Sequence, residues 1–251
     1  RNQTWLPLMA MLVGAIVGGI DDLLVVDAFP KMGTYIGGGL SFPVRLFAVA
    51  SMGVFAGSWF YTKLEVDSIY MPFYGHIHLG LLFIVFFVIV TLALFSTSVI
   101  DGIDGLSGGI FSAIFSAYGV IAFINQQVDI AALCFVIAGG IMAFLWFNIP
   151  PALFYMTETG IMGLLLALSV IVFMTDAVMY LPIIALPLVI TTLSVIVQLL
   201  SKKFLKRKIF LVAPLHHHFE AKGWPRYRIV MRYWIVSYVC ALFGVVIVLI
   251  S

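Results

Sequence analysis

Charged residues are scarce in this sequence of 251 residues: they make up 10% of it, against 63% hydrophobic residues. A soluble domain carries about 25% charged residues, which it needs to cover its surface. The composition therefore excludes an ordinary soluble protein. The sequence also lacks the alternating segments of about ten residues that are typical of a membrane β-barrel. We expect an all-α fold: a polytopic transmembrane helical protein.

Cysteines and nucleotide-binding loops are also rare or missing. The two cysteines, Cys134 and Cys240, lie in apolar runs and are best interpreted as buried free thiols. They predict neither a disulfide framework nor a metal site. A P-loop and a GxGxxG motif are absent from the sequence, so any bound nucleotide must be held in another way.

Long apolar runs dominate what is present. A helix needs about 20 residues to span a bilayer, and eight runs approach that length. They cover residues 5–20, 43–61, 77–97, 109–124, 130–148, 160–176, 180–200 and 229–250. The connections are short except at 21–42, 61–76 and 201–228, and none resembles an interdomain linker. We therefore predict a single integral-membrane domain over residues 1–251.

The basic residues are distributed unevenly between the loops. If each span crosses once, the loops at 21–42, 97–108, 149–159 and 201–228 share one side. Of the 13 Lys and Arg residues, all but Arg1 and Lys63 fall there. These are Lys31, Arg45, Lys202, Lys203, Lys206, Arg207, Lys208, Lys222, Arg226, Arg228 and Arg232. Basic loops stay in the cytoplasm, so this side is predicted to be cytoplasmic.

On the opposite side we expect little chemistry. His76 and His78 precede a span there, so contact with lipid headgroups is the expected role. Asp129 and Asp176 are expected simply to face water.

Four polar clusters fall on the predicted cytoplasmic side. They are Asp21 and Asp22 in GGIDDLL, Asp101 and Asp104 in VIDGIDGLSGG, Asn148 and Glu158 in WFNIPPALFYMTETG, and His216, His217, His218 and Glu220 in LHHHFE. Each alone has an ordinary explanation: a solvated pair, a Gly-Asp turn, a helix cap, or a basic surface near headgroups. Together on one face of the membrane they favour an active site.

The types of side chain in these clusters point to phosphate chemistry. Carboxylates without cysteine partners suit Mg²⁺, which binds one or two of them and leaves positions for phosphate oxygens. Zinc is disfavoured, because three adjacent histidines cannot readily surround one tetrahedral ion. Histidines and bases beside a metal stabilise the charge of a phosphoryl transfer. The chemistry predicts a transferase that joins a soluble phosphorylated donor to a lipid phosphate.

Four segments carry a family resemblance. APLHHHFEAKGW, followed by RIVMRYWI, resembles the signature loop of the phospho-N-acetylmuramoyl-pentapeptide-transferases. IDDLL is similar to the first aspartate motif of that family, and VIDGIDGLSGG to its Asp-Gly-Leu-Asp-Gly-Leu segment. WFNIPPALFYMTETG is similar to its Trp-Phe-Asn…Met-Gly-Asp-Thr-Gly segment. The order and spacing agree over nearly the whole chain.

The resemblance implies a reaction, a cofactor and a location. Phospho-N-acetylmuramoyl-pentapeptide moves from its UDP carrier to undecaprenyl phosphate, UMP leaves, and Mg²⁺ is required. The implied location is the bacterial inner membrane, with many spans and the active site facing the cytoplasm. The partners are the UDP-linked donor, the polyprenyl phosphate acceptor and the bilayer. Nucleic acid is not expected, and a homodimer is compatible with the resemblance.

Carried over residue by residue, the resemblance implies three sets of site residues. The catalytic carboxylates are Asp21, Asp22, Asp101, Asp104 and Glu158. Three of them are the implied metal ligands: Glu158, Asp101 and Asp104. The implied substrate-binding residues are Asn148, Tyr155, His216, His217, His218 and Arg45.

Their individual roles differ. Asp21 and Asp22 match the pair that positions or deprotonates the lipid phosphate. Tyr155 stands where the family has a ring that stacks on uracil. The histidines match a triplet near the donor's pyrophosphate.

The sequence departs from the family pattern at several positions. Glu158 replaces an aspartate and Thr157 a glycine. Ser98 and Ile100 replace an asparagine and a threonine. Val25 replaces a lysine, whose lost charge Arg45 is expected to offset. The family has ten spans, so we expect either a fragment without the first two, which would include a Pro-Thr-Met-Gly-Gly segment, or a shortened paralogue.

Three alternatives stay open at this point. The first is a relative that uses another UDP-N-acetylhexosamine, which the LHHHFE loop disfavours. The second is a transporter, which would place ionisable residues at mid-membrane on broken helices, whereas here they lie at span ends. The third is a catalytically silent homologue, which Glu158 and Ser98 keep open.

Overall fold

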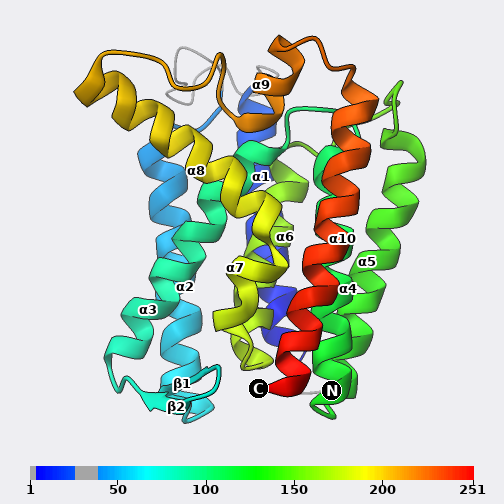
Figure 1. The fold of residues 1–251 in the computed structure, drawn as a ribbon. Coiled ribbons are helices and arrows are strands. Elements are labelled where there is room, and N and C mark those ends of the chain that lie inside the picture. The colour runs from blue at the N-terminus through cyan, green and yellow to red at the C-terminus, as the bar shows by residue number, and fades with distance from the viewer. Residues whose placement is uncertain (1–3, 26–38) are drawn as a thin grey trace. The chain divides into compact units, whose positions relative to one another are not determined.

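The computed structural model describes residues 4–25 and 39–251 (Figure 1). Arg1, Lys31, Gly37 and Gly38 lie outside the described residues. The chain divides into two compact units. Unit 1 contains residues 1–98 and 156–179, and unit 2 contains residues 99–155 and 180–251. The prediction of a single domain stays a prediction.

The all-α transmembrane fold is confirmed. The described part of the chain contains eight helices long and apolar enough to cross a membrane. They are Trp5–Val25, Phe42–Lys63, Leu82–Ile100, Leu106–Ile124, Val128–Asn148, Thr157–Met174, Leu186–Leu205 and Arg226–Ile250. The first runs five residues beyond the predicted end at residue 20, because the two aspartates there continue the helix instead of ending it.

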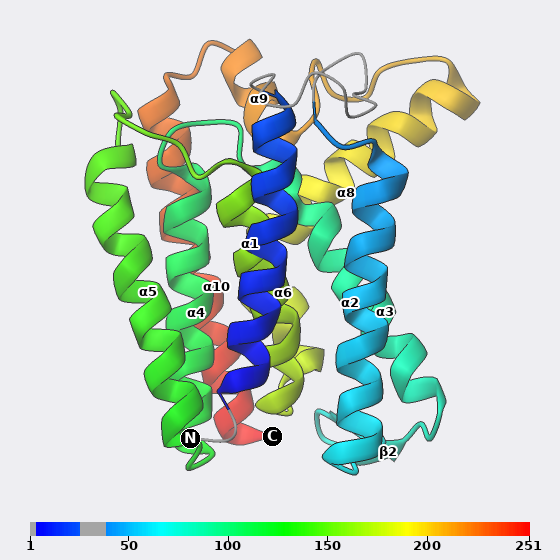
Figure 2. The same ribbon diagram turned by 180° about the vertical axis from the view of Figure 1, so that it is seen from behind.

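Unit 1 is built on four long helices: α1 (Trp5–Val25), α2 (Phe42–Lys63), α3 (Leu82–Phe95) and α6 (Thr157–Met174). Figure 2 shows α1 against α6 and α2 beside α3. Phenylalanines fill the space between α2, α3 and α6. Phe87 stacks on Phe173 with ring centroids 4.2 Å apart, and Phe60 and Phe83 pack around them.

Glycines allow α1 and α6 to approach closely. A Cβ at Gly18 would lie 2.2 Å from the backbone oxygen of Glu158, and one at Gly14 would lie 2.5 Å from that of Met162. Small residues four positions apart are how membrane helices bring their backbones together. Because Gly18 is one turn before Asp21 and Asp22, this contact also fixes where the two carboxylates lie.

Unit 1 also contains a small hairpin, which was not predicted. It follows α2, at the end of the unit opposite to Asp21 and Asp22. Strands β1 (Ser68–Met71) and β2 (Gly75–His78) pair antiparallel, with Ser68 opposite His78. The predicted third span began at residue 77, whereas the helix begins only at Leu82.

The hairpin is fastened by the residues that were expected to face lipid or water. The Tyr70 backbone N–H donates to Asp176 Oδ1 at 3.2 Å, and His76 Nδ1 lies 3.6 Å from Asp176 Oδ2. His78 pairs with Asp67 at 3.1 Å. Burial raises the pKa of Asp176, and the Tyr70 N–H and His76 only partly oppose this effect. Asp176 is half-exposed, as expected, and in addition it fastens the hairpin.

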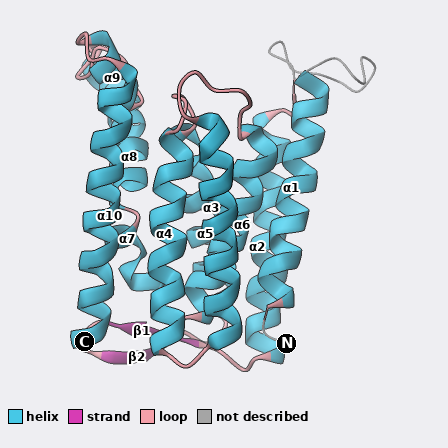
Figure 3. Ribbon diagram, turned by 90° about the vertical axis from the view of Figure 1, so that its right-hand side faces the viewer, coloured by secondary structure: helices cyan, strands magenta, loops and turns pink. Residues whose placement is uncertain are grey.

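Unit 2 is centred on α4 (Leu106–Ile124), which packs against α5 (Val128–Asn148) and α10 (Arg226–Ile250) (Figure 3). A Cβ at Gly109 would overlap the indole of Trp234, so only glycine admits α10 here.

The remaining elements of unit 2 are shorter or broken. Helix α7 (Leu181–Ile184) precedes α8 (Leu186–Leu200), which continues as a π-helical turn over Ser201–Leu205. The predicted seventh span began at residue 180, but Pro187 is placed at the start of a separate helix. The short helix α9 (Leu215–Ala221) carries the histidine triplet.

Candidate active site

In unit 1 the predicted site residues Asp21, Asp22, Arg45 and Glu158 form one cluster. It joins the last turns of α1, the first turn of α2 and the first turn of α6. The glycine contact between α1 and α6 positions the aspartates beside the start of α6.

Asp22 accepts four hydrogen bonds from the start of α6. The hydroxyls of Thr157 and Thr159 donate at 2.6 and 2.5 Å, and the backbone N–H groups of Glu158 and Thr159 donate at 3.2 and 3.0 Å. The first N–H groups of a helix have no partner within it, and its dipole favours a negative charge there. Asp22 therefore caps α6 from a different helix, and this cap fixes the position of Glu158.

Arg45 lies between two carboxylates. Its Nη1 donates to Glu158 Oε1 at 3.1 Å and lies 3.8 Å from Asp21 Oδ2. Asp21 is buried, and its Oδ1 accepts a hydrogen bond from the Leu40 backbone N–H at 2.6 Å. The expectation that Arg45 brings positive charge to this end of α1 agrees with this geometry.

Thr157 has a backbone conformation that favours glycine. Its φ is +52°, in the left-handed region that costs an L-residue roughly 1–2 kcal/mol and is unusual for a β-branched side chain. The resemblance puts a glycine at this position. The chain has therefore kept the glycine-like backbone while adding a hydroxyl that binds Asp22.

In unit 2 the second aspartate pair lies in a tight loop before α4. The loop ends at Gly105, whose φ is +79°. Its N–H donates to Asn148 Oδ1 at 2.8 Å, and its carbonyl accepts the Trp234 Nε1–H at 2.9 Å. Asn148 also donates to the Phe154 carbonyl at 2.9 Å. Asn148 thus ties the aspartate loop to the loop that ends at Tyr155, and its predicted contact with substrate stays a prediction.

Asp101 is held by a hydrogen bond within the loop. Its Oδ1 accepts the Ser107 hydroxyl at 2.7 Å. Partial desolvation and the neighbouring Asp104 carboxylate raise the pKa of Asp101, against the effect of the Ser107 hydrogen bond. A nearby cation would relieve this repulsion.

Helix α9 places two histidines against the same loop. A Cβ at Gly102 would lie 2.6 Å from His216 Nε2 and 2.9 Å from His217 Nε2. Loop and triplet therefore form one cluster within unit 2, as the sequence predicted for these segments.

The three histidines have different environments. His216 is fully buried, and neither ring nitrogen has a hydrogen-bond partner among the described residues. Burial, and repulsion from His217, lower the pKa of His216 to about 4, so it is neutral at pH 7. His217 Nδ1 lies 2.5 Å from Glu220 Oε2. His218 Nδ1 accepts the Leu211 N–H at 3.1 Å, and desolvation followed by Lys222 lowers its pKa.

Glu220 connects the triplet to α10. Its Oε1 accepts the Arg226 Nε–H at 2.7 Å. Desolvation would raise the pKa of Glu220, but the hydrogen bonds from His217 and Arg226 outweigh it and lower the value.

Tyr155 has the exposed ring that stacking on a base requires. Its side chain is 63% exposed.

The described residues contain no group of three or more His, Cys, Asp or Glu side chains that could hold a metal ion. Of the three predicted ligands, Asp101 and Asp104 belong to unit 2 and Glu158 to unit 1. The repelling pair in unit 2 fits a magnesium ion that takes one or two protein carboxylates and its other ligands from phosphate and water.

Sequence reasoning missed several residues that build these clusters. Thr159 and Ser107 bind predicted aspartates, and Trp234 holds the aspartate loop. A signal existed for Thr159, because threonine at a helix start is typical of caps. Trp234 gave no such signal, because a tryptophan near the end of a span is ordinarily an anchor at the membrane interface.

The sequence of this chain is similar to those of known proteins. The model of glycosyl transferase family 4 matches residues 4–176, which is more than half of the chain. The class of protein is therefore a family 4 glycosyl transferase embedded in a membrane.

Several relatives carry a more specific name. A phospho-N-acetylmuramoyl-pentapeptide-transferase of Levilactobacillus brevis is 40% identical over 194 residues, covering 76% of this chain and 60% of that protein. One of Listeria welshimeri is 32% identical over 250 residues, covering 98% and 75%. One of Chlorobium luteolum is 34% identical over 269 residues, covering 94% and 70%. The chain belongs to glycosyl transferase family 4, in the family of the phospho-N-acetylmuramoyl-pentapeptide-transferases.

Proposed function

We propose that the protein transfers phospho-N-acetylmuramoyl-pentapeptide from UDP to undecaprenyl phosphate and so makes lipid I for peptidoglycan synthesis. One observation carries this proposal: the similarity to proteins named for that transfer extends over 98% of the chain. The chain spans 60% of the length of the Levilactobacillus relative, so the activity of the whole protein is proposed.

The proposed reaction exchanges one phosphoanhydride bond for another. An oxygen of the acceptor phosphate attacks the donor phosphorus that carries the sugar. The bond between that phosphorus and the bridging oxygen breaks, and UMP leaves with the electron pair.

Unit 1 is proposed to bind the acceptor. Arg45 offers a guanidinium to the lipid phosphate, because Arg binds phosphate through paired hydrogen bonds. Asp21 or Asp22 orients the phosphate or accepts a proton from it. The four hydrogen bonds to Asp22 support an orienting role for Asp22, since they occupy its carboxylate and hold Glu158 in place.

Unit 2 is proposed to bind the donor. The exposed Tyr155 ring is proposed to stack on uracil, and His217, Lys222 and Arg226 are proposed to contact the pyrophosphate. His216 is neutral, and its unpartnered nitrogens can only give or accept hydrogen bonds there. The positive charge of this loop therefore comes from Lys222, Arg226 and Arg228, with little from His216.

A magnesium ion is proposed as the cofactor, with Asp101 and Asp104, which lie together in unit 2, as its ligands. The role of Glu158 as a further ligand stays a prediction from the resemblance. The ion would supply positive charge that stabilises the transferring phosphoryl group. The raised pKa of Asp101 supports this assignment, because its causes, desolvation first and the Asp104 carboxylate second, are both offset by a bound cation.

The proposed location is the bacterial inner membrane, with the site facing the cytoplasm. In unit 2 the basic residues from Lys202 to Arg232 lie between the end of α8 and the first turns of α10. The histidine triplet lies in the same stretch of the chain. Basic loops of this kind stay in the cytoplasm. A homodimer stays a prediction.

The test is transfer by the reconstituted protein. Vesicles that contain undecaprenyl phosphate are supplied with UDP-N-acetylmuramoyl-pentapeptide and Mg²⁺, and UMP and the lipid product are measured. We expect both products in equal amounts, and none after chelation of the metal. Asp101→Asn should lose activity, whereas Asp129→Asn, at an exposed position in the first turn of α5, should not.

Two results would contradict the proposal. Transfer from UDP-N-acetylglucosamine, but not from the muramoyl-pentapeptide donor, would assign the protein to another branch of the superfamily. Absence of both transfer and donor binding would identify a silent homologue.

A further inference from the structure

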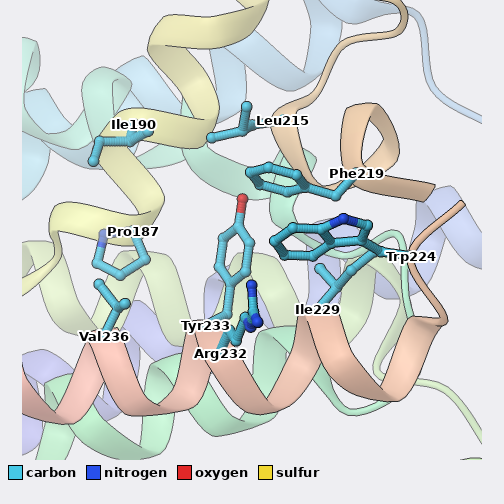
Figure 4. Close-up of a pocket in the computed structure, with 9 residues that line it drawn as sticks. All are labelled: Pro187, Ile190, Leu215, Phe219, Trp224, Ile229, Arg232, Tyr233 and Val236. Carbon is cyan, nitrogen blue, oxygen red and sulfur yellow. The ribbon is translucent and has the colours of Figure 1, made fainter. Parts of the chain in front are cut away.

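An apolar pocket lies between α8, α9 and α10 of unit 2. Its volume is about 260 Å³. Figure 4 shows the residues that line it: Pro187, Ile190, Leu215, Phe219, Trp224, Ile229, Arg232, Tyr233 and Val236. None of them belongs to the predicted site.

The pocket wall is almost entirely hydrocarbon and aromatic. Phe219 and Trp224 stack with ring centroids 4.8 Å apart. The Tyr233 hydroxyl lies 3.5 Å from Thr191 Oγ1. Such a cavity does not hold water well, because a water needs two or more polar partners.

One charge stands at this wall without a counter-ion. The Arg232 guanidinium lies over the Trp224 ring, 4.3 Å from its centroid (Figure 4). Within residues 4–25 and 39–251 no carboxylate forms an ion pair with Arg232. Arg232 is exposed, so its guanidinium is open to an anion at the mouth of the pocket.

The pocket lies near the first residue of α10, at the end of that helix predicted to face the cytoplasm. Arg232 is six residues after the first residue of α10, or about 9 Å along the helix axis at 1.5 Å per residue. Ile190 and Val236 at the rim are 40% and 45% exposed. Neighbouring α10 side chains such as Ile235, 64% exposed, are apolar and suited to lipid.

The volume and the charge together select the ligand. Pockets that enclose whole small ligands measure roughly 300–1,000 Å³, so this one accommodates part of a molecule, such as a length of acyl chain. An Arg at the mouth recognises a phosphate. Basic pockets between membrane helices bind anionic headgroups, and Lys222 and Arg228 add positive charge nearby.

We propose that this pocket binds one anionic diacyl phospholipid, with an acyl chain against Phe219 and Tyr233 and its phosphate on Arg232. The lipid would fill the space between α8 and α10 and contact α9, the helix that carries the histidine triplet. It is distinct from the two substrates.

Lipid binding to the purified full chain tests this proposal. Native mass spectrometry in detergent counts bound phosphatidylglycerol and phosphatidylcholine during titration. We expect one phosphatidylglycerol per chain, bound at least about tenfold more tightly than phosphatidylcholine. Arg232→Gln should weaken phosphatidylglycerol binding by about tenfold or more, the effect of one hydrogen bond to a charged group. Ile190→Trp, which fills the rim, should weaken binding of both lipids.

The matched control is Lys203→Gln. Lys203 also lies over an aromatic ring, 5.5 Å from the Phe204 centroid, but it does not line the pocket. The Lys203→Gln variant should bind phosphatidylglycerol as tightly as the unchanged protein does. Equal affinity for the two lipids, or unchanged phosphatidylglycerol binding in both Arg232→Gln and Ile190→Trp, would overturn the proposal. One-for-one displacement of phosphatidylglycerol by polyprenyl phosphate would also overturn it, because the pocket would then be an acceptor site.

Discussion

At the residue scale, Glu158 is one of the positions where this chain departs from the family pattern. It carries one methylene more than the aspartate expected there, and its Oε1 is held by Arg45. A displacement of about 1 Å in an active site can cost roughly 100-fold in rate. We expect Glu158→Asp to retain or raise transfer activity, and Glu158→Gln to abolish it because a neutral amide binds a divalent cation poorly.

Initial rates at several Mg²⁺ concentrations measure this effect. Thr159→Ser serves as the control, because it keeps the hydroxyl that binds Asp22. Full activity of Glu158→Gln would exclude Glu158 as a metal ligand.

His216 makes the stability of unit 2 depend on pH. Its pKa of about 4 in the folded protein lies below the ordinary value of 6.5, so the unfolded chain binds the proton more readily. The stability contributed by neutral His216 is complete above pH 6.5 and is lost as pH falls towards 4. The loss is at most about 1.4 kcal/mol for each pH unit.

Unfolding midpoints measured in detergent between pH 8 and pH 5 reveal this dependence. We expect His216→Gln to flatten the loss at low pH. His78→Gln, at an exposed hairpin residue in unit 1, should keep it. An identical pH dependence in wild type and His216→Gln would show that His216 does not resist protonation.

At the element scale, the contact between α1 and α6 aligns the carboxylates of unit 1. A methyl group at Gly18 would meet the Glu158 carbonyl oxygen at 2.2 Å, and backbone cannot move aside as a flexible side chain can. At the adjacent Gly19, the nearest atom is the Thr159 hydroxyl oxygen at 3.5 Å, which is ordinary contact.

We expect Gly18→Ala to destabilise unit 1 by about 1–3 kcal/mol, the usual cost of overpacking. It should also disturb the cap at Asp22 and lower activity. Gly19→Ala should change neither property. Thermal unfolding and transfer rates of the two variants decide the matter, and equal effects would mean that the helices are not in close contact at Gly18.

The helices could be predicted from sequence because each is a long apolar run with its own signal. The hairpin could not be, since each strand has only four residues and its fastening to Asp176 depends on a residue far along the chain. The histidine triplet was found because its members are adjacent. The cap formed by Asp22 was missed because its partners follow 135 to 137 positions later, and local patterns do not report such pairings.

At the scale of the whole molecule, the distribution of basic residues predicts which loops face the periplasm and which face the cytoplasm. We expect the hairpin tip at Tyr74, 86% exposed, to face the periplasm. Tyr155 and Lys206 should face the cytoplasm, because the basic loops of unit 2 lie at their end.

Single cysteines at these three positions, with Cys134 and Cys240 replaced by alanine, can be labelled by an impermeant thiol reagent in vesicles of both orientations. Reaction of all three from the same side would refute the predicted topology. Thr62→Cys, in the last turn of α2, should react from the same side as Tyr74→Cys.

The division of the chain also has a consequence in time. Unit 1 is interrupted in sequence by residues of unit 2, so the ribosome makes α4 and α5 before α6. After Asp22 the ribosome must add 135 residues to reach Thr157, which takes about 7–27 s at 5–20 residues per second. Throughout that interval α6 has not been synthesised, so the carboxylate of Asp22 and the glycine face of α1 have no partner helix. Slower translation between α3 and α6 would lengthen this exposure to chaperones and membrane proteases, and the yield of folded protein would fall with it.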